Sequence, residues 1–100
     1  MTQAIEHTPP EGMSLEANWP DVVNAIADFA VQMRDKMESV KHKGHWRYVD
    51  WGYLIHRLET ELEELHGELE CGNREAAIKE CVDVANCAMM LADYLKNKGF

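Results

Sequence analysis

Two short acidic motifs contain the residues whose types and spacing could do chemistry. Glu61 and Glu64 lie three positions apart in "LETELEELHGEL", and Glu80 and Asp83 lie three positions apart in "KECVDVANCAMMLAD". Residues at this spacing are neighbours on one face of a helix, so the carboxylates of each pair can converge. Carboxylate oxygens are hard ligands that favour Mg²⁺ or Mn²⁺. If the two motifs face each other, they predict a metal site of four carboxylates.

The surroundings of the second motif strengthen this interpretation. Between Cys81 and Ala92, Asp83 and Asn86 are the polar residues. A helix that is apolar on nearly all sides is typically buried, and a buried carboxylate needs a cation, a network of donors or a proton. A divalent cation would satisfy this need. The alternative is that the acids of this motif bond to basic residues of another helix: Arg57, His56 or a lysine.

A leucine stripe runs along the acid-rich segment 51–71 and separates its glutamates by position. The stripe consists of Leu54, Leu58, Leu62, Leu65 and Leu69. At about 100° per residue, Glu61 falls at the edge of this stripe, Glu64 lies further out on the same flank, and Glu63 points away. We therefore expect Glu61 and Glu64 to face the second motif. The alternative is that both belong to a solvated face, which is common in glutamate-rich helices.

A di-iron carboxylate site is another metal chemistry that a helical bundle can carry. Glu63 and His66 form one ExxH motif of the kind that such sites use. However, Asp83 stands where a second histidine would be needed, and Glu63 points away from the stripe. The pattern therefore favours Mg²⁺ over iron.

Three helices must position these residues. They are predicted at residues 18–41, 51–71 and 74–96. The first segment repeats apolar side chains by threes and fours, which is typical of an amphipathic helix. No segment has the pattern of a strand. The sequence therefore predicts an all-α fold, with one helix followed by a helical hairpin.

Residues with strong positional preferences mark the ends of these helices. Asn18 is the predicted cap of the first helix, and Asp50 is the predicted cap of the second. Gly72 suits the end of a helix, and Asn73 suits the start of the next. The tight turn between them predicts that the last two helices are antiparallel.

The segment 41–53, "KHKGHWRYVDWGY", interrupts the helical pattern. It contains two glycines and is rich in tryptophan, tyrosine, histidine and basic residues. We interpret it as a functional loop between the first two helices.

Length and composition limit the alternatives. The 100 residues fit a single domain, which we place at 18–100 after a flexible arm at 1–17. A chain this short buries a limited core, so oligomerisation is a natural supplement. The net charge of −8 argues against binding a nucleic-acid polymer. No stretch has the length of a membrane span or the core of a signal peptide, so a cytoplasmic location is expected. The three cysteines are expected to be buried free thiols in a reducing compartment: Cys71, Cys81 and Cys87.

The two motifs and their spacer resemble the signature of the MazG-like all-α nucleoside triphosphate pyrophosphohydrolases, which is ExxE followed by ExxD. The preceding segment is similar to the dATP/dGTP pyrophosphohydrolase subgroup, which often carries an HKGxW-like loop, here His42 to Trp46. The similarity covers roughly residues 22–95. Leu62 interrupts the double glutamate with which many members begin the motif, so Glu64 and Glu68 are an alternative pair.

This resemblance implies a function. It implies that Glu61, Glu64, Glu80 and Asp83 bind Mg²⁺, with Mn²⁺ as the other suitable ion. It also implies hydrolysis of a nucleoside or deoxynucleoside triphosphate, with a purine dNTP favoured, to the monophosphate and pyrophosphate. The active unit would be a homodimer or homotetramer, in which helices of two subunits complete a four-helix bundle.

Further roles follow from this implied reaction as hypotheses. Glu61 or Glu64 would accept the proton of the attacking water. Basic loop residues would meet the phosphates, tryptophans would stack on the base unless they pack in the core, and the histidines would make polar contacts. The residues expected to contact substrate are Lys41, His42, Lys43, His45, Trp46, Arg47, Trp51 and Asn86. Asn86 would contact either a metal-binding carboxylate or the sugar. The alternative function is a non-catalytic helical protein that binds nucleotides or acts as a regulatory dimer.

Overall fold

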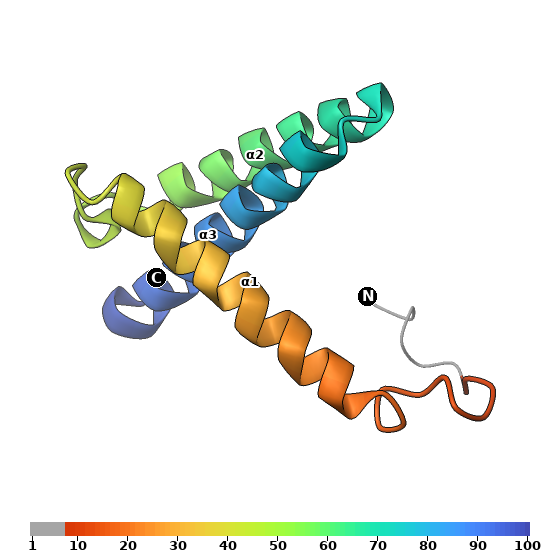
Figure 1. Ribbon diagram of the computed structural model, residues 1–100. Helices are drawn as coiled ribbons and strands as arrows, with labels where there is room; N and C mark the ends of the chain where they lie inside the picture. Colours follow the sequence, from red (N-terminus) through yellow and green to blue (C-terminus); the bar gives the residue numbers. More distant parts are fainter. Residues whose placement is uncertain (1–7) are drawn as a thin grey trace. The chain divides into compact units, whose positions relative to one another are not determined.

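The computed structural model describes residues 8–100, and these residues are helical apart from turns and loops (Figure 1). The elements, in chain order, are α1 (Trp19–Ser39), the short 3-10 helix η1 (Trp46–Tyr48), α2 (Trp51–Cys71) and α3 (Arg74–Lys98). No strand occurs among residues 8–100. The all-α fold with three main helices is therefore confirmed. None of the helices in this part of the chain combines the length and apolar character that crossing a membrane requires.

The described part of the chain divides into two compact units, with the boundary between Ala30 and Val31. In the first unit, residues 8–17 form turns before α1, and the rest of the predicted flexible arm lies outside the described residues. Asn18 directly precedes α1, as predicted, but its side-chain amide does not bond to the start of the helix. Its amide nitrogen donates to the carbonyl oxygens of Gly12 and Ser14 instead, at 3.0 and 2.8 Å. The backbone carbonyl of Asn18 receives the first helical N–H groups, those of Asp21 and Val22.

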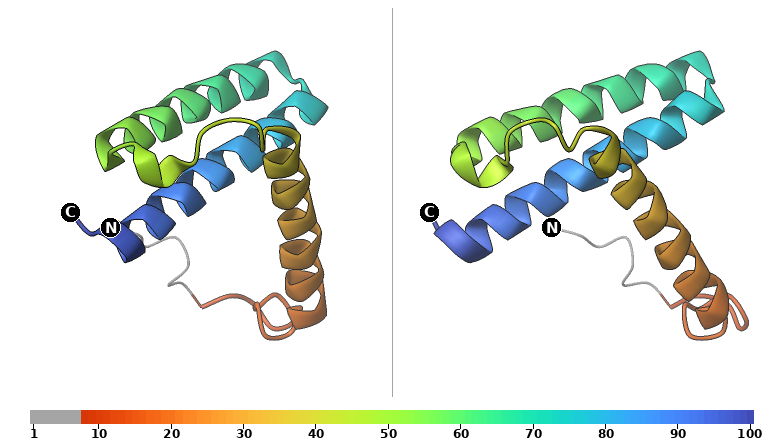
Figure 2. Two further views of the ribbon diagram at one scale, coloured as in Figure 1. Left: turned by 90° about the vertical axis from the view of Figure 1, so that its left-hand side faces the viewer. Right: turned by 60° about the vertical axis from the view of Figure 1, so that its left-hand side comes forward.

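The second unit contains the antiparallel hairpin of α2 and α3, which lie side by side in all views (Figure 2). Asp50 caps α2 by accepting a hydrogen bond from the Tyr53 N–H at 2.9 Å. Gly72 ends α2 in the left-handed conformation, with φ of 71°, which glycine adopts without steric cost. Asn73 then caps α3 by accepting from the Ala76 N–H at 3.2 Å. These three sequence predictions are confirmed. Gly72 and Asn73 together explain why the chain reverses between α2 and α3.

The core of the hairpin is small. Its buried apolar residues are Leu54, Ala77, Val82 and Cys87. The prediction that α3 is buried on nearly all sides is wrong for the single chain, because Ile78 is 46% exposed and Cys81 is exposed. The leucine stripe of α2 is likewise covered only in part, since Leu62 and Leu69 are exposed.

The three cysteines have different environments. Cys87 is buried as predicted, whereas Cys71 and Cys81 are exposed. The apolar composition around Cys81 led to the wrong prediction, because composition does not tell which side of a helix a neighbour covers. All three are free thiols.

Candidate functional site

Three of the four predicted metal-binding acids come together across the hairpin. Glu61 and Glu64 of α2 and Glu80 of α3 each place one carboxylate oxygen within 4.8 Å of the other two. The three-residue spacing on α2 puts Glu61 and Glu64 on one face, and the antiparallel partner brings Glu80 to that face. We call these three residues the carboxylate cluster. Groups of partly exposed acids such as this one are common without a metal.

Glu80 has the least favourable environment in the carboxylate cluster. Its Oε1 atom is buried and has no hydrogen-bond partner among residues 8–100. Loss of solvent, followed by the contacts with the carboxyl groups of Glu61 and Glu64, raises the pKa of Glu80 from 4.5 to about 7. Glu61 is partly compensated by Arg57, whose Nη2 lies 3.4 Å from its Oε2. The free chain therefore holds Glu80 near its titration point at neutral pH.

The structure places Asp83 outside the carboxylate cluster. Its Oδ1 lies 3.3 Å from Nζ of Lys36, in the part of α1 that belongs to the second unit. One turn further along α3, the Asn86 amide donates to the Met33 carbonyl at 3.3 Å. These two contacts, one turn apart on each helix, show that polar side chains of α3 hold this end of α1. Pairing with a lysine of another helix was the alternative to a metal, and Asp83 has such a partner.

Asn86 is the one buried polar residue among residues 8–100. Only 3% of its surface is exposed, and its Oδ1 atom has no hydrogen-bond partner. Asn86 also lines the pocket described next. The structure therefore gives Asn86 a structural contact with α1 through its side-chain nitrogen.

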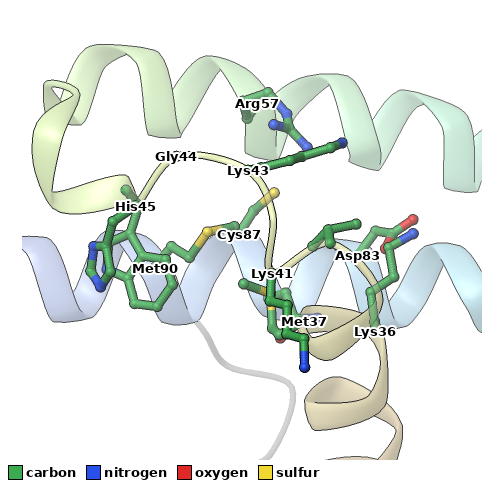
Figure 3. Close-up of a pocket in the computed structure, with 13 residues that line it drawn as sticks. Lys36, Met37, Lys41, Lys43, Gly44, His45, Arg57, Asp83, Cys87 and Met90 are labelled. Atoms are coloured by element: carbon green, nitrogen blue, oxygen red, sulfur yellow. The ribbon is translucent and has the colours of Figure 1, made fainter.

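A pocket of about 510 Å³ is lined by residues from the end of α1, the loop that follows it, α2 and α3 (Figure 3). Met37, Val40, Cys87 and Met90 give it apolar walls. The charged side chains that line it are Lys36, Lys41, Lys43, Arg57 and Asp83. The pocket lining thus contains four of the ten lysine and arginine side chains of this acidic protein and only one acidic side chain. We call this cavity the basic pocket, and it suits an anion that also has an apolar part.

Arg57 connects the basic pocket to the carboxylate cluster. It lines the pocket and also pairs with Glu61. Figure 3 shows Arg57 of α2 reaching toward Lys43, which the loop carries across the pocket. The neighbouring Tyr53 makes the largest contribution to raising the pKa of Arg57 above its ordinary value, so this side chain stays charged. A positive pocket therefore adjoins a negative cluster.

The loop before α2 is fixed to α3 by Asp93. Its Oδ2 accepts hydrogen bonds from the Trp46 Nε1 and the Arg47 Nε, both at 2.8 Å, and its Oδ1 accepts from the Arg47 Nη2 at 2.9 Å. The hydrogen bonds from Arg47 and then from Trp46 lower the pKa of Asp93 from 3.8 to about 2. This interaction holds the Trp46 ring in the pocket wall.

The predicted substrate-binding residues fall into two groups. Those that line the basic pocket are Lys41, Lys43, His45, Trp46 and Asn86; those that do not are His42, Arg47 and Trp51. Arg47 is occupied by Asp93, and Trp51 packs edge-on against Phe100 at a ring distance of 6.1 Å. His45 lies against Trp46, with ring centroids 4.2 Å apart, and caps η1 by accepting from the Arg47 N–H.

The sequence did not predict that Lys36 and Arg57 line the basic pocket or that Asp93 fixes the loop to α3. Lys36 adjoins the apolar repeat of α1, so its spacing places it beside the helix face that packs. Asp93 is an acid near the end of a mostly apolar helix, and such an acid needs a donor, which Arg47 and Trp46 of the loop supply. A smaller cavity of about 340 Å³ shares residues 43–46 with the basic pocket and adds Tyr48 and Tyr53. Sequence spacing alone gave no signal for these two tyrosines.

Comparisons of this chain with protein-family models, with curated proteins and with solved structures found no match.

Proposed function

We propose that this protein is a Mg²⁺-dependent pyrophosphohydrolase that converts a nucleoside triphosphate, with a purine dNTP favoured, to the monophosphate and pyrophosphate. One observation carries this proposal: the unpartnered Glu80 oxygen lies in a carboxylate cluster that adjoins a pocket with four basic side chains. A metal–polyphosphate complex needs these two opposite charges next to each other. The sequence resemblance to MazG-like enzymes, which rests on the same acids and on the loop at 42–46, is a further support.

The donor set suits Mg²⁺, and Mn²⁺ would fit for the same reason. All donors are carboxylate oxygens, and the Glu80 oxygen has no other partner. Glu61, Glu64 and Glu80 would hold the ion, and Asp83 would join them after leaving Lys36. Bound there, Mg²⁺ screens phosphate charge and lowers the pKa of a water molecule.

The chain's own residues would orient the substrate. Lys43 makes no ion pair among residues 8–100, so its ammonium group is available to a phosphate. Lys41 has only an exposed partner, Glu38, at 3.7 Å. The Trp46 ring, held by Asp93, offers a flat surface to a base. Glu64 is exposed and accepts the proton of the attacking water in this proposal.

The active unit would be a homodimer or homotetramer. Support comes from apolar side chains of the hairpin that the single chain leaves exposed: Leu62 at 44%, Leu69 at 61% and Ile78 at 46%. A second copy could cover these side chains. Analytical ultracentrifugation should give a mass above that of one chain, and a monomer at all concentrations would contradict this part of the proposal.

The central experiment measures pyrophosphate release from each NTP and dNTP in the presence of Mg²⁺. We expect Glu80→Gln and Asp83→Asn to lower turnover by about 100-fold or more, as for the loss of one charged group that stabilises a transition state. Glu63→Gln is the matched control, because Glu63 is an exposed acid of α2 outside the carboxylate cluster. Unchanged turnover in the Glu80 and Asp83 variants would exclude the proposed metal site.

A non-catalytic nucleotide-binding or regulatory protein is the second candidate function. The Lys36–Asp83 ion pair favours it, because a four-carboxylate site is incomplete while Asp83 is engaged elsewhere. This candidate predicts nucleotide binding that requires a divalent ion but yields neither monophosphate nor pyrophosphate. Equilibrium binding and product analysis on the same samples separate the two functions.

A further inference from the structure

We propose that Lys36 is a positioning residue that exchanges partners: it pairs with Asp83 in the metal-free chain and with the polyphosphate when a divalent cation takes Asp83. This inference rests on the proposed function and deepens it. It assigns to the site a residue that the acidic motifs and the loop did not include. It also makes the basic pocket and the carboxylate cluster depend on each other.

The position of Lys36 supports this exchange. Both Lys36 and Asp83 line the basic pocket, and their charged ends meet there (Figure 3). Asp83 lies three residues after Glu80 on α3, so it is the neighbour of the carboxylate cluster on the same helix face. The ion pair of Lys36 and Asp83 therefore lies at the pocket, on the helix that also carries Glu80.

The ion pair is weak enough to be exchanged. The Lys36 side chain is 46% exposed and that of Asp83 is 22% exposed. Ion pairs in such partly solvated positions add little to stability. A divalent cation attracts a carboxylate more strongly than an ammonium group does, because its charge is twice as large. Asp83 can therefore change partner without unfolding its surroundings.

The backbone need not move for this exchange. The end of α1 is also held by the hydrogen bond from Asn86 to the Met33 carbonyl, which does not involve Lys36. Once released, the Lys36 ammonium group would lie in a pocket with Lys43 and Arg57 and would repel them. An anion in the pocket would remove this repulsion. Metal binding and anion binding should therefore favour each other, as any coupling between two sites is reciprocal.

The first test measures the affinity for Mn²⁺ alone by water-proton relaxation. Lys36→Met removes the competitor for Asp83, so we expect Mn²⁺ to bind about five- to tenfold more tightly than to the wild type. Lys79→Met is the matched control. Lys79 precedes Glu80 and is exposed, and it makes no ion pair among residues 8–100, so its loss should change the Mn²⁺ affinity by less than about twofold.

The second test measures binding of inorganic triphosphate with Mg²⁺ by isothermal titration calorimetry. Here Lys36→Met should bind about tenfold more weakly, because the pocket has lost a phosphate partner. The two effects of one substitution thus have opposite signs. General damage to the fold would weaken both ligands, and Lys36→Arg, which keeps the charge, should restore both affinities toward those of the wild type.

The outcomes separate this inference from the proposed function. Equal Mn²⁺ affinities of Lys36→Met and Lys79→Met, in a protein whose Glu80→Gln variant loses Mn²⁺, would overturn the role of Lys36 and leave the metal site standing. Absence of Mn²⁺ binding in both the wild type and Lys36→Met would overturn the metal site, and the role of Lys36 with it. Weaker binding of both ligands to a Lys36→Met chain of normal circular dichroism would overturn the exchange, since it shows a structural role alone.

Discussion

Glu80 and Asp93 are acids of the same helix, and their environments are opposite. Asp93 accepts three hydrogen bonds from Trp46 and Arg47, and its pKa falls to about 2. Glu80 faces two other carboxylates, has a buried oxygen without a partner, and has a pKa of about 7. The difference comes from the neighbours that each residue meets, because both start from the same carboxyl chemistry.

The partners of each carboxylate distinguish a structural acid from a candidate functional one. The partners of Asp93 lie within the chain, and it fixes the loop to α3. Among the described residues, no basic side chain pairs with Glu80, so a cation from solution could stabilise its ionised form. The two acids should respond differently to Mg²⁺, to pH and to substitution, with effects on the free energy of unfolding that decrease in this order.

Mg²⁺ is expected to produce the largest difference between the two acids. An ion that binds only the folded chain stabilises it by about 2.7 kcal/mol at 100 times its dissociation constant. Urea unfolding should show this shift in the wild type and in Asp93→Asn, which leaves the carboxylate cluster intact. Glu80→Gln should lose most of it. An equal shift in all three proteins would show that Mg²⁺ does not act through Glu80.

The pH dependence of stability without divalent ions should be the next largest effect. Between pH 4.5 and 7 the unfolded chain has ionised Glu80 while the folded chain keeps it protonated, so the folded state binds more protons. Stability should therefore fall as pH rises through this range, by on the order of 2 kcal/mol, with the loss complete above pH 7. Chemical denaturation in a chelator at several pH values measures this loss.

Glu80→Gln provides the control for that pH profile. Because glutamine does not ionise, the variant should be more stable than the wild type at pH 7.5 and should lack the decline between pH 5 and 7. Parallel profiles for the two proteins would assign the pH dependence to another group. If Glu80→Gln is both more stable at pH 7.5 and unable to bind Mg²⁺, the ionised Glu80 side chain lowers stability but is needed for metal binding.

Asp93→Asn is expected to have the smallest effect on stability and the clearest effect on the loop. The side chains of Arg47 and Asp93 are partly exposed, and ion pairs of this kind contribute little. The contribution of Asp93 is present above pH 3.8 and is lost as pH falls toward 2, so the variant should resist acid in that range. Tryptophan emission should shift to the red as Trp46 loosens. An unchanged spectrum would show that Asp93 does not hold the loop.

Much of the fold could be predicted because local signals agree with it. Asp50, Gly72 and Asn73 mark helix ends by their own chemistry, and the structure uses them as predicted. Asn18 carries the same local signal, but its amide finds carbonyl oxygens in the preceding turn. The preference of asparagine for helix starts is therefore overridden where other hydrogen-bond partners lie close to its side chain.

The site could be predicted only where spacing decides it. The spacing within α2 and the tight turn to α3 bring Glu61, Glu64 and Glu80 together. The partner of Asp83 comes from a helix distant in sequence, and spacing along one helix contains no information about it. Arg47 was similarly predicted to bind phosphate, but its partner in the structure is Asp93. Contacts between distant segments depend on how helices pack, which a single sequence does not reveal.

The tight turn at Gly72 and Asn73 also bears on the order of folding. It joins α2 and α3 with almost no loop to close, so the chain loses little entropy when the hairpin forms. The bond from Trp46 to Asp93 joins residues 47 positions apart and must close a much longer stretch. We therefore expect the hairpin to form early and the loop to dock late. Substitutions in the turn should slow refolding, whereas substitutions at Asp93 should mainly speed unfolding.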